Sequence, residues 1–68
     1  QKLLTISLTN REKDIVRLLA LNNTTNQIAK KLHISPHTVS AHRKNILSKL
    51  NFDSTKELVQ YCLVNLLF

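Results

Sequence analysis

One interval of the chain carries basic and small polar side chains without any acidic neighbour. The segment from Ser35 to Phe52 contains Arg43, Lys44 and Lys49 but no Asp or Glu. A solvated helix face usually carries charges of both signs. Cationic groups that lack acidic neighbours suit phosphate groups and the acceptor edges of nucleic-acid bases. The chemistry predicted for this interval is therefore non-covalent binding of a polyanion.

The charge of the whole chain agrees with this interpretation. Its 68 residues contain ten Lys and Arg against four Asp and Glu, a net charge of +6 at neutral pH. Such a balance favours nucleic acid or an anionic membrane surface as the partner. A basic surface without a function is the alternative on charge alone. The length allows one small domain, which we expect to span residues 1–68.

Capping signals mark where the positioning elements begin. The spacing of a capping box, in which a hydroxyl and a side chain three residues later bond each other's backbone amides, occurs at Thr9–Glu12, Thr24–Gln27 and Ser54–Glu57. Ser35 and Pro36 form a further start signal, an N-cap followed by proline at the first helical position. Asn22 and Asn51 stand where the chain leaves a helix, and asparagine tolerates the left-handed conformation used there.

Together with apolar residues at helical period, these signals predict four helices, at about residues 10–21, 25–32, 36–50 and 55–67. No segment alternates apolar and polar residues for long enough to predict a strand. The expected fold class is all-α, a four-helix domain in which the third helix carries the basic interval.

The third helix has an apolar side and a free side. Val39, Ile46 and Leu50 share the apolar side with His42, which we expect to be buried or half-buried and bonded to the backbone. The opposite side carries short or basic residues, namely His37, Ser40, Ala41, Lys44 and Ser48. A helix face without bulky or acidic side chains suits the major groove of DNA.

Groups suited to the DNA backbone surround this face. Thr24, Thr25 and Asn26 lie at the start of the second helix, whose free amides can donate to a phosphate oxygen. Lys30 and Lys31 follow them in the same helix. Thr38, Arg43 and Lys49 flank the free face of the third helix. Contacts of this kind position a protein on DNA without reading its sequence.

Other kinds of site are disfavoured by the sequence. His33, His37 and His42 are spaced by four and five residues, which does not bring all three together, so we expect no metal and no cofactor. Few carboxylates and no phosphate-binding glycine loop argue against an enzyme. Cys62 lies on an apolar stripe and is expected to act as a small hydrophobe. No segment is long enough to span a membrane, and we expect a cytoplasmic location.

A membrane-surface or protein-interaction module remains a competing function. Such a module needs a helix with one broad apolar face and a basic opposite face. The most apolar helix expected here is the fourth, and it carries almost no positive charge, whereas the basic third helix has an ordinary core stripe. The balance therefore favours double-stranded DNA as the partner.

The order and spacing of these motifs resemble the LuxR-type helix-turn-helix domain. The resemblance covers nearly the whole chain and is carried by Leu8-Thr9-x-Arg11-Glu12, Ile28-Ala29-x-x-Leu32, Ser35-Pro36-x-Thr38-Val39-x-x-His42 and Ile46-x-x-Lys49-Leu50. It implies a bacterial transcription regulator whose third helix enters the major groove and binds DNA sequence-specifically. It also implies a phosphorylatable receiver or a small-molecule-binding domain before Gln1, where the chain begins without methionine.

The resemblance assigns roles by position. Base contacts fall on His37, Ser40, Ala41 and Lys44, and phosphate contacts fall on Thr24, Thr25, Thr38, Arg43 and Lys49. Asparagine replaces the glycine that the family often has at positions 22 and 51. Thr25 stands where many relatives have asparagine, and Ser40 and Ala41 are smaller than the residues that many relatives carry.

The fourth helix is more apolar than one core contact requires. Val59, Leu63 and Leu66 form a second stripe, which we expect to pair two copies of the chain, in agreement with what the resemblance implies for this helix. Fraying, or contact with an upstream domain, is the alternative for this stripe. For the function as a whole, the nearest rival is a promoter-binding module like region four of a sigma factor, acting with RNA polymerase.

Overall fold

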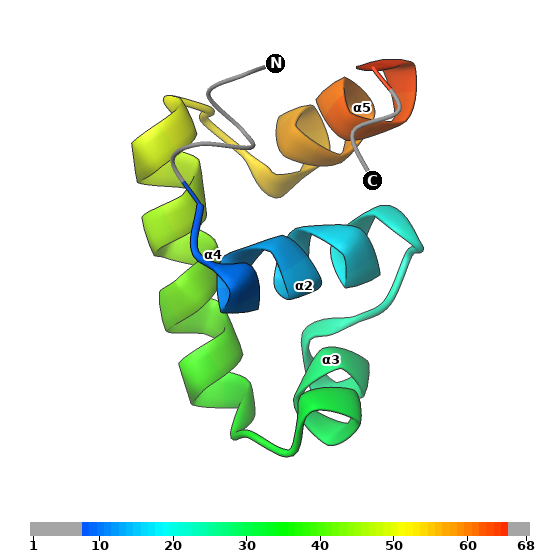
Figure 1. Cartoon of the computed structure of the whole chain (residues 1–68), viewed down its shortest axis with the longest axis vertical. Coiled ribbons are helices and arrows are strands. Elements are labelled where there is room, and N and C mark those ends of the chain that lie inside the picture. Colours follow the sequence, from blue (N-terminus) through cyan, green and yellow to red (C-terminus); the bar gives the residue numbers. More distant parts are fainter. Residues whose placement is uncertain (1–7, 66–68) are drawn as a thin grey trace.

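The computed structural model of the chain describes residues 8–65, in which there are four helices and no strand. The all-α class is therefore confirmed. The helices are α2 (Asn10–Ala20), α3 (Thr25–Leu32), α4 (Pro36–Leu50) and α5 (Thr55–Asn65). In Figure 1, α2 lies between α3 and α5, and α4 runs along the long axis of the molecule beside them. The expected end of the last helix near residue 67, like Leu66, lies outside the described residues.

Two complete capping boxes start α2 and α3. The Glu12 amide donates to Thr9 Oγ1 at 3.1 Å, and the Thr9 amide donates to Glu12 Oε1 at 2.9 Å. The same reciprocal pair joins Thr24 and Gln27, at 3.2 and 2.8 Å. Each N-cap of this kind stabilises its helix by about 1 kcal/mol. The predicted starts of these two helices are thus confirmed by their geometry.

The starts of α4 and α5 use other arrangements. Ser35 Oγ accepts from the Thr38 amide at 3.0 Å ahead of Pro36, as predicted. At α5, Ser54 Oγ accepts from the Glu57 amide at 3.3 Å. The Glu57 carboxylate accepts from the Asp53 amide at 2.8 Å, one residue earlier than a capping box requires. The predicted third box is therefore only half formed, because the exposed Glu57 side chain reaches past the N-cap residue.

Three helices end in the same left-handed turn without any glycine. Asn22, His33 and Asn51 have φ angles of 70°, 58° and 59°. After each of them, the next amide bonds the carbonyl five residues back, as the Ile34 amide does to the Ala29 carbonyl at 3.0 Å. This is the Schellman motif. The left-handed conformation was expected at Asn22 and Asn51, whereas that of His33 was not.

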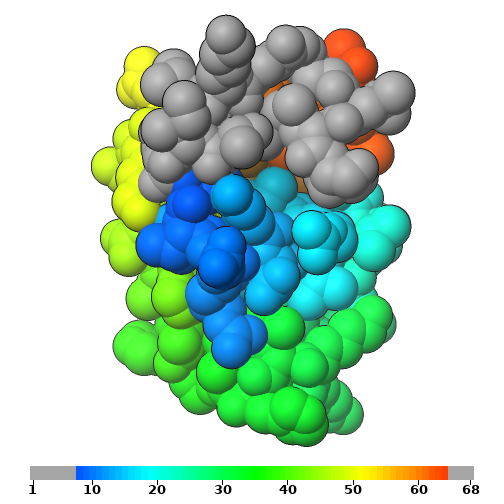
Figure 2. All heavy atoms as spheres, in the orientation of Figure 1, coloured from blue at the N-terminus to red at the C-terminus, as the bar shows by residue number. Residues whose placement is uncertain are grey.

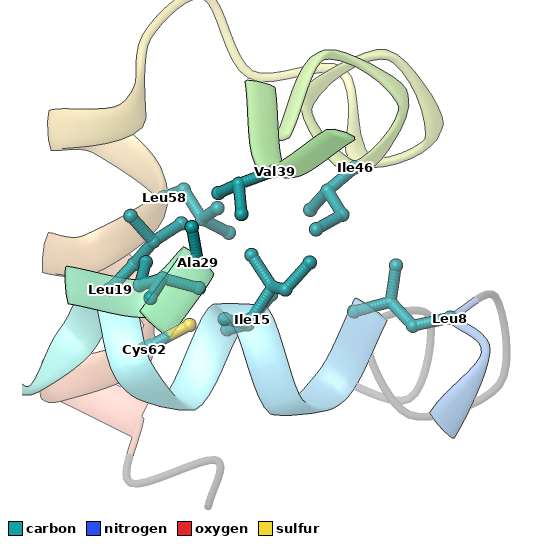
Figure 3. Packing of buried hydrophobic residues seen from close by; sticks show 10 residues of the cluster. Leu8, Ile15, Leu19, Ala29, Val39, Ile46, Leu58 and Cys62 are labelled. Carbon is teal, nitrogen blue, oxygen red and sulfur yellow. The ribbon is translucent and has the colours of Figure 1, made fainter. Parts of the chain in front are cut away.

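The core is built from all four helices. Its fully buried side chains are Ile15 of α2, Ile28 of α3, Val39 and Ile46 of α4, and Leu58 and Cys62 of α5. Figure 3 shows Ile15 pointing from α2 toward Val39 and Ile46. Burying a large aliphatic side chain contributes about 1.5–3 kcal/mol. These contacts fix α4 against α2 and leave the other side of α4 facing outward.

Cys62 belongs to this core as a small hydrophobe. It is a free cysteine with no exposed surface, and burial raises the pKa of its thiol. Among residues 8–65, no helix is both long enough and apolar enough to cross a membrane.

Candidate nucleic-acid interface

The outward side of α4 forms a ridge of exposed residues. His37, Ala41, Lys44 and Ser48 are all exposed. At 3.6 residues per turn they fall within an arc of about 60° around the helix axis. Val39 and Ile46, on the opposite side, have no exposed surface. We call these four exposed residues the α4 ridge.

Ser40 differs from the other predicted base-contacting residues. It is half-buried, whereas His37, Ala41 and Lys44 are exposed. Helix geometry places Ser40 about 70° from the middle of the α4 ridge. That offset turns it toward the flank that carries Arg43, which contacts α3.

On this flank, Arg43 connects α4 to the beginning of α3. Its Nη1 atom donates to Thr25 Oγ1 at 3.2 Å. Thr24 Oγ1 is taken by the Gln27 amide, so it serves as the N-cap of α3. The amides of Thr25 and Asn26 lie in the first turn, where an α-helix offers no internal acceptor. A guanidinium and two free amides of a helix N-terminus thus lie close together, and both kinds of group bind phosphate well.

The other flank of the α4 ridge carries Thr38 and Lys49. Thr38 is exposed, and its Oγ1 lies 2.9 Å from Ser35 Oγ, which holds it in the first turn. Lys49 Nζ donates to Glu12 Oε1 at 2.8 Å, and its side chain is 39% exposed. An ammonium group has three N–H donors. Lys49 therefore ties α4 to α2 while keeping donors that can face a phosphate.

Glu12 is the one charged residue of the described part of the chain that is buried, at 4% exposure. Burial by itself raises the pKa of its carboxyl. The hydrogen bonds from Lys49 and Thr9 and the positive charge of Lys49 outweigh burial, so the pKa of Glu12 is lowered from its ordinary value of 4.5. Residues 12 and 49 are 37 positions apart. Sequence reasoning assigned Glu12 only to the cap and missed this ion pair.

The sequence did not predict the arrangement of two further residues, Lys31 and Asn45. Lys31 Nζ donates to Asn23 Oδ1 at 2.7 Å, which ties α3 to the preceding turn. Asn45 is exposed on α4, four residues after Ala41, and was not among the predicted contacts. The four-residue spacing could have indicated Asn45, because it continues the row His37–Ala41 along the helix.

The histidines do not form a metal site. Within residues 8–65, no group of three or more His, Cys, Asp or Glu side chains is arranged to hold a metal ion. His42 is half-buried, as expected from its side of the helix. The expected hydrogen bond from His42 to the backbone is not among the bonds of the described residues.

Positive charge is concentrated on α3 and α4. The four carboxylates of the chain lie at positions 12, 14, 53 and 57, so residues 15–52 carry none. The same interval holds six Lys and Arg: Arg17, Lys30, Lys31, Arg43, Lys44 and Lys49. The four other basic residues balance the four acids, so the interval accounts for the whole net charge of +6. In Figure 2, the residues of α3 and the start of α4 gather at the end of the molecule away from α5.

Two helices joined by a tight turn, the second of them presenting a basic ridge, define a helix-turn-helix domain. Residues 6–62 match the family described as bacterial regulatory proteins, luxR family. The chain belongs to this family of DNA-binding domains in transcription regulation. The predicted family is thereby confirmed, and the sigma-factor alternative is not favoured.

Similar proteins include several bacterial regulators. The chain is 45% identical over 56 residues to the oxygen regulatory protein NreC of Staphylococcus carnosus, covering 82% of this chain and 26% of that protein. It is 44% identical over 54 residues to the fimbriae Z protein of Salmonella typhimurium, covering 79% and 26%. It is 45% identical over 56 residues to the response regulatory protein YgeK of Escherichia coli K12, covering 82% and 38%. The chain thus spans about a quarter to two fifths of these relatives.

Proposed function

We propose that the chain binds double-stranded DNA sequence-specifically, with α4 inserted in the major groove. The observation that carries this proposal is the α4 ridge itself, which is exposed, free of carboxylates and bordered on both flanks by groups that bind phosphate. A helix of about 10–12 Å diameter fits a groove about 12 Å wide. The small residues of the ridge allow its backbone to approach the bases closely.

The base contacts in this proposal follow from side-chain chemistry. Lys44 is exposed on the ridge and is suited to the O6 and N7 acceptors of guanine. Ala41 offers a methyl group to the C5-methyl of thymine. His37 lies in the first turn of α4, the part of a recognition helix that usually meets base edges. Ser40, being half-buried, contributes from the edge of this set.

The phosphate contacts in this proposal hold the ridge from both sides. On one flank are Thr24, Thr25 and Arg43, which bring the N-terminus of α3 to one DNA strand. On the other flank are Thr38 and Lys49, which face the opposite strand. Each neutralised phosphate adds to the salt dependence of binding, because bound counterions are released.

We further propose that two copies pair through α5. Leu63 is 51% exposed and the adjacent Val64 is 80% exposed, so α5 presents neighbouring apolar side chains of the kind found at interaction sites. Val59 is half-buried and packs against the core, so the paired stripe is centred on Leu63. Pairing would present two α4 ridges to half-sites about 10 base pairs apart. The greater length of the relatives is consistent with a sensor or receiver domain in the complete protein.

The DNA-binding proposal is tested by fluorescence anisotropy. A labelled random duplex pool measures general affinity, and a site selected from that pool measures specific affinity. Wild-type binding should fall steeply between about 50 and 200 mM salt. Lys44→Ala should weaken binding to the selected site by about 10–100-fold, the range expected for one base contact.

Lys56→Ala is the matched control, because it removes the same charge from an exposed position on α5. It should change affinity by less than about twofold, since exposed charges beyond a Debye length are screened. Equal losses in the two variants would contradict the proposed role of α4. The absence of wild-type binding at low salt would contradict DNA binding by this chain.

A further inference from the structure

Asn45 extends the exposed surface of α4 beyond the residues that the family resemblance assigned. It is exposed and lies next to Lys44 in the chain. Helix geometry places both Asn45 and Ser40 about 70° from the middle of the α4 ridge, on opposite sides of it. The two residues differ in exposure, because Ser40 is half-buried whereas Asn45 is exposed. Asn45 is therefore better placed than Ser40 to meet a base in front of the ridge.

The surroundings of Asn45 leave its amide free. Side chains on a helix lean toward its N-terminus, over the residue four positions earlier. For Asn45 that residue is Ala41, whose methyl group leaves the path to the groove open. Four positions later, Lys49 is held by Glu12 at 2.8 Å. Within residues 8–65, the Asn45 amide has no hydrogen-bond partner.

The chemistry of the side chain points to one base. An asparagine amide carries a donor and an acceptor that pair with the N7 and N6 groups of adenine in the major groove. Neighbouring residues on a helix are offset by about 1.5 Å along its axis and 100° around it. Asn45 and Lys44 would therefore meet different base pairs.

We propose that Asn45 is an additional specificity-determining residue, which reads an adenine next to the base pair that Lys44 contacts. This inference rests on the proposed binding of α4 in the major groove. It adds a hydrogen-bonded adenine to each half-site, beside the apolar thymine contact proposed for Ala41. Thr38 and Lys49, at about 90° and 110° from the middle of the ridge, remain the groups nearer to phosphate.

Site selection from a random duplex pool tests the inference, with wild type, Lys44→Ala and Asn45→Ala compared. Asn45→Ala should lose the preference for adenine at one A·T pair of each half-site. Lys44→Ala should lose the base preference at a neighbouring pair. On the wild-type site, Asn45→Ala should bind about 5–100-fold more weakly, with an unchanged salt slope because no charge is removed. Asn45→Gln should keep the adenine preference, since glutamine forms the same pair.

A modified base separates base reading from other effects. Replacing the implicated adenine by 7-deazaadenine removes the N7 acceptor, and should weaken the wild type while leaving Asn45→Ala unchanged. Gln60→Ala, at an exposed amide on α5, is the control and should match the wild type. Circular dichroism should show the same helix content for all variants, because Asn45 is exposed.

Each other outcome overturns the inference. Equal losses of Asn45→Ala on selected and scrambled DNA would assign Asn45 to the phosphate backbone. An unchanged adenine preference in Asn45→Ala would show that Asn45 has no role in recognising the base. Failure of the wild type to select any site would overturn the proposed function as well, and this is visible before any Asn45 variant is compared.

Discussion

Glu12 links the start of one helix to the end of another. Its carboxylate accepts from the Thr9 amide at 2.9 Å and from Lys49 Nζ at 2.8 Å. It is buried, so the loss of its partners would leave a desolvated acceptor without a hydrogen bond, which destabilises the folded state. The same side chain therefore caps α2 and fixes the C-terminal end of α4, whose orientation determines how the α4 ridge is presented.

We expect Glu12→Gln to lower the free energy of unfolding by about 1–2 kcal/mol at neutral pH, discounted from a fully buried pair because Lys49 is partly solvated. The folded pKa of Glu12 lies below its ordinary value of 4.5. Its stabilising contribution is therefore present above that value and is lost as the pH falls through the lower folded pKa. Urea unfolding at a series of pH values between neutral and about 3 measures both effects.

Asp14→Asn is the control for this prediction. Asp14 pairs with Arg17 at 3.7 Å on the surface, and such pairs contribute little. The Glu12 variant should show a flatter dependence of stability on acid pH than the wild type, whereas the Asp14 variant should follow the wild type. A Glu12→Gln curve that coincides with the wild type at every pH would show that the ion pair does not stabilise the fold.

At the scale of helices, start signals were predicted more completely than ends. Thr9, Thr24 and Ser35 are local signals, because the groups that they bond lie within three residues. The left-handed turn at His33 was missed because glycine and asparagine are the usual markers of such a turn. The left-handed conformation costs roughly 1–2 kcal/mol for a residue with a side chain. The backbone bond from the Ile34 amide to the Ala29 carbonyl closes this turn, and α4 begins three residues after His33, at Pro36.

The α5 helix supplies the prediction at this scale. Leu63→Glu should convert a dimer of the chain to a monomer, because the change places a charge in the proposed apolar contact. Light scattering over a range of protein concentrations measures the mass directly. Val64→Glu is the matched control: Val64 is 80% exposed and lies about 100° around the helix from Leu63. It should leave the dimer intact.

Two results would contradict pairing through α5. The wild type could remain a monomer at every concentration, or the two variants could behave alike. Either result would show that the exposed side chain of Leu63 does not pair two copies of the chain.

At the scale of the whole molecule, charge and apolar surface are separated. α3 and α4 hold five of the ten basic residues and no carboxylate, whereas α5 holds Lys56 and Glu57 together with exposed Leu63 and Val64. This separation was readable from the sequence, as were the family and the all-α class, because they depend on local pattern and composition. This separation agrees with the proposals that the α3–α4 end contacts DNA and that α5 contacts a second copy of the chain.

The detailed contacts of the candidate nucleic-acid interface could not be predicted from the sequence in the same way. The bond between Arg43 and Thr25 and that between Lys49 and Glu12 join residues 18 and 37 positions apart. The half-burial of Ser40 and the exposure of Asn45 depend on how α4 packs against the other helices. Tertiary packing sets these features, and a helical repeat alone does not contain them.

The most direct measurement of the central claim is a nuclear magnetic resonance titration of the isotope-labelled chain with its selected DNA site. A duplex of about 20 base pairs would span two half-sites one helical turn apart. The account predicts the largest amide shifts in residues 24–26, at the N-terminus of α3, and along the α4 ridge and Asn45, with small shifts at Lys56 and Gln60 of α5. Large shifts confined to α5 or to the outer side of α2, with the α4 ridge unchanged, would contradict it.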